Sequence, residues 1–250
     1  MKSTVEQIRA RFDADVERFS NLETGQSATM DAPLCMDLVA SAAVAVMQGG
    51  MRDLLDIGCG AGNYTLKVIQ KLAAAQNGGG RVALNCTLVD LSRPMLDKAV
   101  ERITAQTSGT VRAMQGDMRE LELGEQSFDA VVTAATLHHL RSDEEWRAMF
   151  AKIHRALRPG GALWIFDFVE QVNPAIHAMM WERYGEYLEA LKGGGEAGRV
   201  YREHVFAYVT QEDTPRDVGF QLRMMREVGF VGEEILHKNG LFAAFGARRK

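Results

Sequence analysis

The sequence predicts an α/β protein whose centre is a doubly wound, mostly parallel sheet, and three observations support this. Short apolar runs alternate with amphipathic stretches over residues 51–169. Glycines follow the first apolar run at Gly58, Gly60 and Gly62, and an Asn-Gly pair separates the last two apolar runs. Strands that alternate with helices of about 10 to 15 residues are typical of parallel strands joined by right-handed crossovers.

Composition narrows the function classes. Hydrophobic residues make up 46% of the 250 residues and charged residues 25%, as in a globular protein with one large domain. A formal charge of -4 supplies no general basic field, so a nucleic-acid partner is not favoured.

The sequence also suggests in which cellular compartment the protein is located. The cysteines, Cys35, Cys59 and Cys86, lack metal-ligand spacing and are expected to be reduced thiols in the cytoplasm. The N-terminus is charged throughout, and the longest apolar stretch, residues 38–47, is half of the roughly 20 residues that a membrane span needs. We therefore expect no signal peptide and no membrane span.

Residues 1–50 are expected to form an N-terminal helical cap. Apolar residues recur every three or four positions over residues 4–20, which predicts one amphipathic helix. A second helix is predicted from Asp31, as its N-cap, to Met47, before Gly49 and Gly50. The polar segment between them, residues 21–33, is a candidate lid.

Residues 51–169 are expected to form a cofactor-binding core. Its predicted strands are residues 52–57, 82–90, 111–116, 128–134 and 162–168. Its predicted helices are residues 64–75, 93–105 and 143–157, with the first ended by the glycines of 77–80 and the last by 158–161.

The alternation fails over residues 170–214, which we interpret as a helical, substrate-side insert. Residues 174–195 are predicted to be helical, whereas residues 196–209 lack a clear period. Residues 215–250 are predicted to form a final helix (215–230) and a hairpin of strands 231–238 and 241–249. Asn239-Gly240 between them favours a type I′ turn, which needs two positive φ angles.

The glycine loop does not match the common phosphate-binding loops. In a dinucleotide fingerprint the third glycine is at the position that Asn63 occupies here. A P-loop ends in Gly-Lys-Ser/Thr, which is absent from this loop. A nicotinamide-dependent dehydrogenase and a nucleotide triphosphatase are therefore both disfavoured.

Acids follow three successive predicted strands. Asp56 precedes the turn, where it disfavours a pyrophosphate and favours a cationic or amino group. Asp90 has the position of a ribose-diol acceptor, and Asp117 lies at the same carboxyl edge. The pattern favours a nucleoside that carries an amino acid and no phosphate.

At this point the chain resembles the class I S-adenosylmethionine-dependent methyltransferases, in particular their small-molecule members. The resemblance depends on "LLDIGCGAGNYT", "LVDLS", "QGDM", "FDAVVTAATLHHL" and "LRPGGALWIFDF", in that order, and on the C-terminal hairpin. It implies a Rossmann-like, seven-stranded sheet with an antiparallel last strand. It also implies S-adenosyl-L-methionine as cofactor and S-adenosyl-L-homocysteine as product.

The resemblance also implies positions for the cofactor. The loop from Gly58 to Gly62 would lie against its methionine part, and Asp56 would organise the loop and the amino group with carbonyls near Thr133 and Ala134. The ribose and adenine would be bound by Asp90, Leu91, Asp117 and the backbone of Met118.

Two adjacent histidines are the candidate catalytic residues. His138 and His139 follow the fourth strand, where enzymes that methylate base or glutamine amines usually carry Asn/Asp-Pro-Pro-aromatic. We therefore expect a small-molecule acceptor, with one histidine orienting or deprotonating it. With no acid at ligand spacing, we expect no metal site.

Acceptor-binding residues are expected in the insert, as an aromatic wall with a cationic end. The candidates are Trp181, Tyr184, Tyr187, Arg199, Tyr201, Arg202 and His204. Of these, Arg199 and Arg202 are the preferred ligand contacts, and the alternative is that Trp181, Tyr184 and Tyr187 only pack the insert onto the sheet.

Several alternatives stay open at the level of sequence. The same fold serves enzymes that remodel the sulfonium cofactor or bind a carboxylated form of it in tRNA wobble-uridine modification. It also serves non-catalytic modules that bind the cofactor. The acceptor, the atom methylated and the oligomeric state, monomer or homodimer, are not determined by the sequence.

Overall fold

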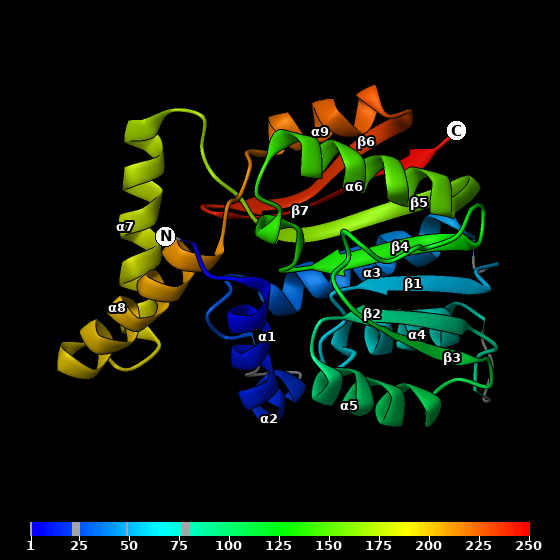
Figure 1. The fold of residues 1–250 in the computed structure, drawn as a ribbon, viewed down its shortest axis with the longest axis horizontal. Helices are drawn as coiled ribbons and strands as arrows, with labels where there is room; N and C mark the ends of the chain where they lie inside the picture. Colours follow the sequence, from blue (N-terminus) through cyan, green and yellow to red (C-terminus); the bar gives the residue numbers. More distant parts are fainter. Residues whose placement is uncertain (1, 22–25, 49, 77–80) are drawn as a thin grey trace.

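A computed structural model describes residues 2–21, 26–48, 50–76 and 81–250. Its centre is a seven-stranded sheet of order β3-β2-β1-β4-β5-β7-β6 (Figure 1). The strands are β1 (Asp53–Ile57), β2 (Asn85–Asp90), β3 (Val111–Gln115), β4 (Phe128–Ala134), β5 (Leu157–Phe168), β6 (Phe230–Asn239) and β7 (Phe242–Arg249). Because β7 alone runs antiparallel to its neighbours, β5 and β6, the predicted doubly wound sheet with a reversed last strand is confirmed.

The strand order reverses between β1 and β4. After β1 the chain adds β2 and β3 on one side, and then returns to place β4 on the other side of β1. In sheets of this kind the crevice beyond the carboxyl ends at such a switch point is where ligands bind. The glycine loop directly follows β1 and therefore lies at this point.

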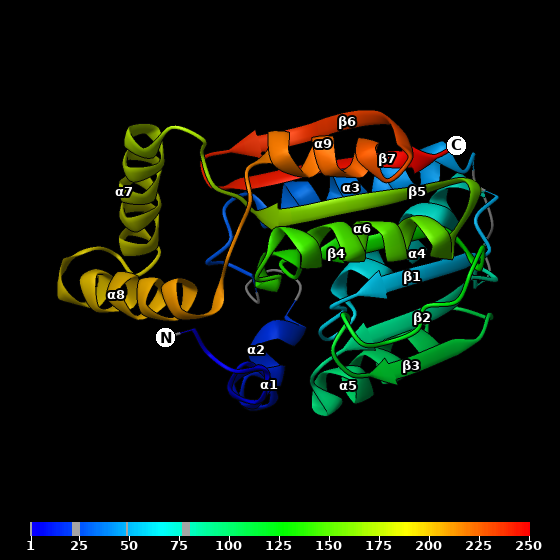
Figure 2. The ribbon, with the colours of Figure 1, turned by 45° about the horizontal axis from the view of Figure 1, so that its top comes forward.

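Helices cover both faces of the sheet (Figure 2). One face is covered by α3 (Ala32–Val46), α4 (Asn63–Ala75) and α5 (Arg93–Thr104), and the other by α6 (Asp143–Ala156) and α9 (Val218–Glu227). Successive residues of a strand point to opposite faces. Accordingly Leu54 belongs to the first core, whereas Leu55 and Ile57 belong to the second.

The N-terminal helix differs from the prediction. Two helices, α1 (Val5–Ala14) and α2 (Val16–Ser20), replace the single helix expected over residues 4–20, because the backbone leaves the helical region at Asp15. Thr4 and Gln7 form a capping box at the start of α1, which satisfies two free backbone amides.

Asp31 precedes α3 as predicted but does not cap it through its side chain. Its backbone is left-handed, with φ 58°, and its Oδ2 accepts hydrogen bonds from His237 Nε2 and Asn239 Nδ2, both at 2.8 Å. It therefore fastens the start of α3 to β6. Gly49, one of the two expected helix stops, lies outside the described residues, as do the glycines of 77–80 and part of the candidate lid.

The insert consists of two helices that extend beyond the end of the sheet (Figure 1). They are α7 (Pro174–Ala190) and α8 (Gly195–Glu212), so the insert is helical as expected, including residues 196–209, which lack a clear apolar period. Helix α7 is anchored by aromatic contacts of Trp181 with Phe168 and of Tyr184 with Phe242, at centroid distances of 5.8 and 5.3 Å. The packing interpretation of these two side chains therefore has direct support.

The structure also differs from the sequence prediction at the start of β5 and at the turn between β6 and β7. The segment expected to close α6, residues 158–161, is the start of β5. The hairpin at Asn239-Gly240 is present, but only Gly240 has a positive φ, 54°, so the type I′ prediction was wrong. Asn239 stays in β6, where its side chain donates to Asp31.

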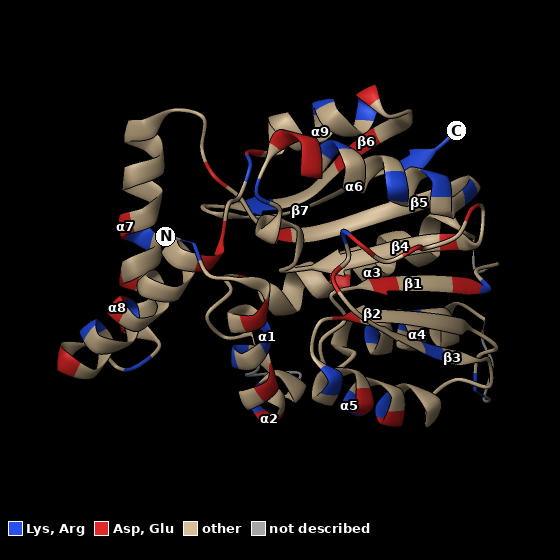
Figure 3. Cartoon of the chain, viewed as in Figure 1, with Lys and Arg blue, Asp and Glu red and all other residues tan. Residues whose placement is uncertain are grey.

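Among the described residues, none of the helices combines the length and hydropathy that crossing a bilayer requires. Acidic and basic residues are interspersed along the surface helices, for example on α5 and α8 (Figure 3). This mixture agrees with the small formal charge of -4.

Candidate active site

Each glycine of the loop after β1 has a positive φ: 69° at Gly58, 49° at Gly60 and 85° at Gly62. A Cβ at Gly58 would lie 2.0 Å from Thr136 Oγ1, and one at Gly62 would lie 2.8 Å from Ile103 Cδ1. At Gly60 nothing lies within 4 Å. The outer glycines let the loop pack closely, and the middle one leaves open space beside its backbone.

Asp56 is buried at the end of β1. Its Oδ2 accepts a hydrogen bond from Thr65 Oγ1 in α4, 2.7 Å away. Burial raises the pKa of Asp56 to about 7, because it penalises the ionised form more than the Thr65 hydrogen bonds favour it.

Asp90, at the end of β2, holds the glycine loop. Its Oδ2 accepts from the backbone amide of Gly60 at 2.8 Å, and its Oδ1 accepts from that of Ser92 at 2.9 Å. Burial raises the pKa of Asp90 to about 6 despite these amides. A cationic group would favour the ionised form of both Asp56 and Asp90.

A cavity of about 280 Å³ opens beside this loop. The candidate cofactor residues that line it are Asp56, Gly58, Gly60, Asp90, Leu91, Asp117, Met118 and Ala134. The fold thus brings together residues from the ends of four strands. Of the other candidates, Gly62 packs against α5, and Thr133 is fully buried in β4.

The N-terminal helices close one side of the cavity. Ile8 and Phe12 of α1, Phe19 of α2 and Gln26 are part of its lining. Asn63 Nδ2 donates to the backbone oxygen of Phe19 at 2.9 Å, so the residue that broke the dinucleotide fingerprint instead ties this cap to the glycine loop.

Arg119 is a lining residue that the sequence interpretation missed. Its guanidinium donates to both carboxylate oxygens of Asp117 and, at 2.9 Å, to Glu145 Oε1 of α6. Burial opposes ionisation of Asp117, but Arg119 outweighs it and lowers the pKa of that carboxyl. Glu145 also accepts from the backbone amide of Arg141 at 2.6 Å. An arginine two residues after a strand-end acid was the only sequence signal for this network.

These features fit the nucleoside that the sequence suggested. Asp56 is a buried acceptor and Asp90 a half-buried one for amino and hydroxyl groups, and Gly60 leaves space where a Cβ would stand. Apolar surface for a base is supplied by Val89, Leu91, Met95 and Met118.

A second, smaller cavity of about 100 Å³ adjoins the first. Both cavities are lined by Phe12, Phe19, Ala135 and His139. The remaining wall of the second cavity is mainly aromatic, from Phe166, Phe168, Tyr184, Tyr208 and Phe242.

His138 is held between two carboxylates. It lies in a short 3-10 helix, η1 (Leu137–His139), and its Nδ1 is hydrogen-bonded to Asp167 Oδ1 of β5. Its Nε2 lies 3.5 Å from Asp213 Oδ1. Burial by itself disfavours the charged imidazolium, but the carboxylates of Asp213 and Asp167 outweigh it and raise the pKa of His138 to about 9.

His139 also faces Asp213, with 3.3 Å between its Nδ1 and Asp213 Oδ1. This nitrogen is buried and makes no hydrogen bond. Burial, reinforced by the neighbouring His138, lowers the pKa of His139 well below its ordinary value. The expectation that no acid lies at ligand spacing from the two histidines was wrong, because the end of α8 brings Asp213 to them from a distant part of the chain.

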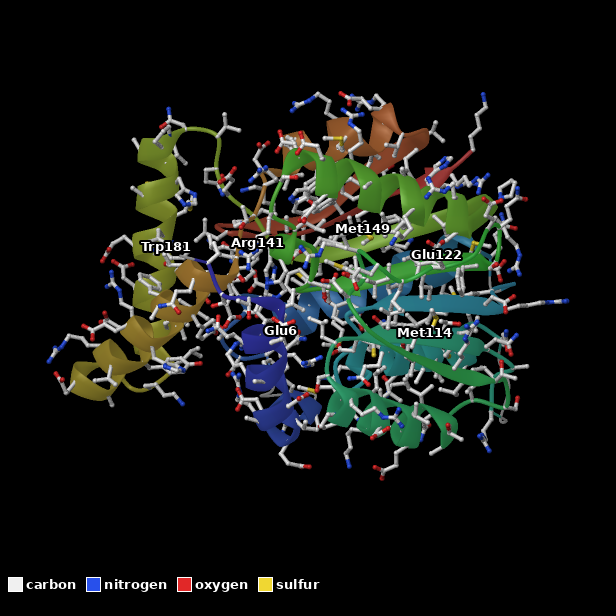
Figure 4. All side chains as sticks on the ribbon, viewed as in Figure 1. Glu6, Met114, Glu122, Arg141, Met149 and Trp181 are labelled. Carbon is white, nitrogen blue, oxygen red and sulfur yellow. The ribbon has the colours of Figure 1, made fainter. Side chains whose placement is uncertain are left out.

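The residues of the insert that were expected to bind the acceptor do not lie together around one cavity. Tyr184 lines the second cavity, whereas Trp181, Arg199 and Tyr201 line neither cavity. Arg199 is exposed and paired with Glu196, and Tyr201 contacts the ammonium of Lys192. Figure 4 shows Arg141 at the end of the sheet and Trp181 farther out, on α7.

The second-cavity residues that the sequence interpretation missed come from elsewhere. Phe12 and Arg11 belong to α1, Asp167 to β5, and Tyr208 and Asp213 to the end of the insert. Phe12 lies in the periodic segment 4–20 and Asp167 in the quoted segment 157–168, but neither pattern indicated that these side chains would share a cavity.

The sheet order and a glycine loop with acids on three strand ends define an α/β domain with a candidate nucleoside site at its switch point. Comparisons with known proteins agree. Residues 54–161 match a family model described as "Methyltransferase domain". An uncharacterized methyltransferase of Mycobacterium bovis is 28% identical over 151 residues, which cover 60% of this chain and 64% of that protein.

Two further comparisons extend over more of the chain. A malonyl-[acyl-carrier protein] O-methyltransferase of a Paenibacillus species is 24% identical over 90% of this chain and 85% of its own. The solved structure of the [4+2]-cyclase SpnF has a TM-score of 0.62 and 15% identity, and covers 99% of this chain and 97% of its own. At that identity the likeness shows the fold alone. The family model and the methyltransferase relatives thus support the class I S-adenosylmethionine-dependent methyltransferase family that the motifs of this chain indicated.

Proposed function

We propose that the protein transfers a methyl group from S-adenosyl-L-methionine to a small-molecule acceptor bound in the second cavity. The observation that carries this is the shared lining of the two cavities by Phe12, Phe19, Ala135 and His139. It supports a cofactor and an acceptor that meet at this boundary.

The cofactor, when bound, supplies a methyl group on a positively charged sulfur. We assign its amino group to Asp56 and the backbone near Thr133 and Ala134, and its methionine part to the loop from Gly58 to Gly62. Its ribose is assigned to Asp90. Its adenine is assigned to Leu91, Met118 and the Asp117–Arg119 pair, because these residues line the far side of the cavity.

The second cavity favours a compact acceptor with an aromatic or apolar body. Aromatic rings make up much of its wall, and its polar groups include the two histidines, Asp167, Asp213 and Arg11. Arg11 is already paired with Glu212, so it supplies less positive charge than a free guanidinium. Of the predicted insert residues, only Tyr184 supports direct contact with the acceptor.

Most of the rate enhancement would come from alignment and from exclusion of water. The cap formed by α1 and α2 encloses the boundary between the cavities, and the aromatic wall keeps the acceptor side apolar. His138 and His139 stand where the acceptor atom would lie. We propose that the pair orients this atom and assists removal of its proton.

The proposal is tested with purified full-length protein, S-adenosyl-L-methionine labelled in the methyl group, and a panel of phenols, enols, carboxylates and amines. Labelled product is expected from a subset of the panel, and transfer should fall in His138→Ala and His139→Ala while cofactor binding persists. Wild-type turnover in both variants would show that the histidines do not act on the acceptor.

Cofactor binding without transfer to any acceptor would favour the non-catalytic module. The cofactor-remodelling alternative required an arginine of the insert near the cofactor, but Arg199 and Arg202 line neither cavity and pair with glutamates. Mass spectrometry of the ligand retained through purification separates that alternative, because a carboxylated cofactor differs in mass.

A further inference from the structure

We propose that His138, His139 and Asp213 form a binding site for a divalent transition-metal ion of the zinc type, which holds an oxygen atom of the acceptor. This inference deepens the proposed function and rests on it for the identity of the acceptor cavity. It gives the histidine pair a specific chemical task, that of metal ligands.

The distances among the three side chains match a metal site. Asp213 Oδ1 lies 3.5 Å from His138 Nε2 and 3.3 Å from His139 Nδ1, and the three ligand atoms lie within 4.8 Å of one another. In a tetrahedral zinc site with bonds of about 2.1 Å, neighbouring ligand atoms are about 3.4 Å apart. The two distances from Asp213 Oδ1 to the histidine nitrogens therefore already match those between ligands of a tetrahedral zinc ion.

The same distances are poor for direct hydrogen bonds. His139 Nδ1 is buried and has no hydrogen-bond partner, although it faces the carboxylate. A buried nitrogen without a partner costs free energy, which a ligand at this position would recover. The unpaired nitrogen is thus an independent indication that the cluster binds something between its members.

Asp167 supplies the outer support that metal-bound histidines usually have. It is hydrogen-bonded to His138 Nδ1, and its Oδ1 also accepts from the backbone amide of Phe168 at 2.8 Å. A carboxylate that accepts a hydrogen bond from Nδ1–H of a neutral imidazole keeps the proton on Nδ1, leaves Nε2 with a free lone pair and fixes the ring orientation. That Nε2 is the atom that faces Asp213.

The charges around the cluster also favour a dication. Asp167 and Asp213 are both buried, and burying two carboxylates without compensating charge is costly. Besides the His138 imidazolium that these carboxylates favour, the surrounding cations are Arg11, which is paired with Glu212, and Lys2, which donates to the backbone oxygen of Asp213. A divalent ion would balance the two carboxylates.

All three ligand residues line the second cavity, so a remaining coordination position would face the acceptor. An acceptor hydroxyl bound there loses its proton more readily: its O–H bond breaks, the electron pair stays on oxygen, and the proton passes to water. The favoured acceptors are therefore phenols, enols and similar oxygen acids.

The test uses full-length protein stripped with a chelator and titrated with ZnCl₂ by calorimetry, with the visible spectrum of CoCl₂-loaded protein as a second readout. We expect one ion per chain with a tetrahedral cobalt spectrum. Asp213→Asn and His139→Gln should weaken zinc binding at least about tenfold, and Asp167→Asn about 10- to 100-fold. His154→Gln, which alters a histidine on α6 outside both cavities, is the matched control.

Failure of the wild-type protein to bind zinc at micromolar concentration overturns the proposal, and so does unchanged binding in both ligand variants. Folding of both variants is checked by thermal unfolding, because His139 also lines the first cavity; if Asp213→Asn fails this check, His139→Gln decides. Undiminished methyl transfer in excess chelator would overturn the ion's part in the reaction and leave the proposed function intact. Zinc binding without any methyl transfer would overturn the proposed function and leave the metal site intact.

Discussion

The carboxylate of Asp90 holds Gly60 by its backbone amide, with 2.8 Å between the carboxylate oxygen and the amide nitrogen. A strand-end acid of β2 thereby fixes the loop that follows β1. The candidate ribose-binding residue and the glycine loop are one structural unit, so a change in either should alter both cofactor affinity and the loop.

Asp90→Ala should weaken S-adenosyl-L-homocysteine binding at least about tenfold, because it leaves the amides of Gly60 and Ser92 without their charged acceptor. Calorimetric titration measures the effect. Asp97→Ala is the matched control, since Asp97 is exposed and pairs only with Arg93. Wild-type affinity in Asp90→Ala would contradict the proposed cofactor site.

Gly58→Ala and Gly60→Ala should lower the folding stability for different physical reasons and by different amounts. The new methyl at Gly58 collides with Thr136, so this variant should lose about 3 kcal/mol of folding free energy or more, and its Tm should fall by about 6 °C or more. At Gly60 the methyl meets open space, so only the left-handed backbone costs about 1–2 kcal/mol.

The same Gly60→Ala methyl projects beside the cofactor cavity, and it should weaken cofactor binding more than it lowers Tm. Thermal unfolding and calorimetry on both variants separate the two effects. Equal losses of Tm in the two variants would contradict the packing described for the loop.

Cofactor affinity should rise with pH between about 5.5 and 8. Burial raises the pKa of Asp56 to about 7 and of Asp90 to about 6, and a cationic cofactor favours the ionised forms of both. Titrations with S-adenosyl-L-methionine at several pH values measure this, and Asp56→Asn should flatten the upper part of the profile. A flat wild-type profile would contradict the assignment.

Ionisation of Asp56 and Asp90 should affect the folding stability of the ligand-free protein in the opposite direction, so that this stability falls as pH rises. Their folded-state pKa values are above those of the unfolded chain, so their contribution is complete below about pH 4 and is lost as pH rises towards 7. Thermal unfolding of the wild type and Asp56→Asn across this range isolates the contribution of Asp56, since the variant should lose less stability.

Substitutions in the insert should show by their effect on folding stability which side chains pack in the core and which lie on the surface. Tyr184→Ala removes a buried ring that packs on Phe168 and Phe242, and should cost about 3 kcal/mol or more. Tyr184→Phe loses only the hydrogen bond from the hydroxyl to Ala28 O, worth about 1 kcal/mol. Denaturant unfolding distinguishes the two values.

Arg199→Glu is the surface counterpart. Arg199 is exposed, so the reversal should change Tm by less than about 2 °C and leave cofactor affinity unchanged. It should also leave the acceptor KM unchanged, since Arg199 lines neither cavity. A large rise in acceptor KM would restore the sequence-based assignment of Arg199 as a ligand contact.

The sequence predicted the features that depend on local pattern. The alternation of apolar runs and amphipathic stretches gave the order of the core elements, and the glycines after β1 marked the loop at the switch point. Asp56, Asp90 and Asp117 were predictable because parallel strands bring their carboxyl ends to one edge. The error at the N-terminus was also local, because Asp15 interrupts an otherwise continuous helical period.

By itself the sequence therefore determined the fold class and the strand-end groups of the first cavity, because strand ends and turns are set by neighbouring residues. Only the tertiary structure decided which residues form the second cavity. His138 meets Asp167 and Asp213 across 29 and 75 positions of chain, and Phe12 and Tyr208 reach the same cavity from opposite ends of the sequence. Such contacts depend on how whole helices pack, and no spacing rule within one segment encodes them.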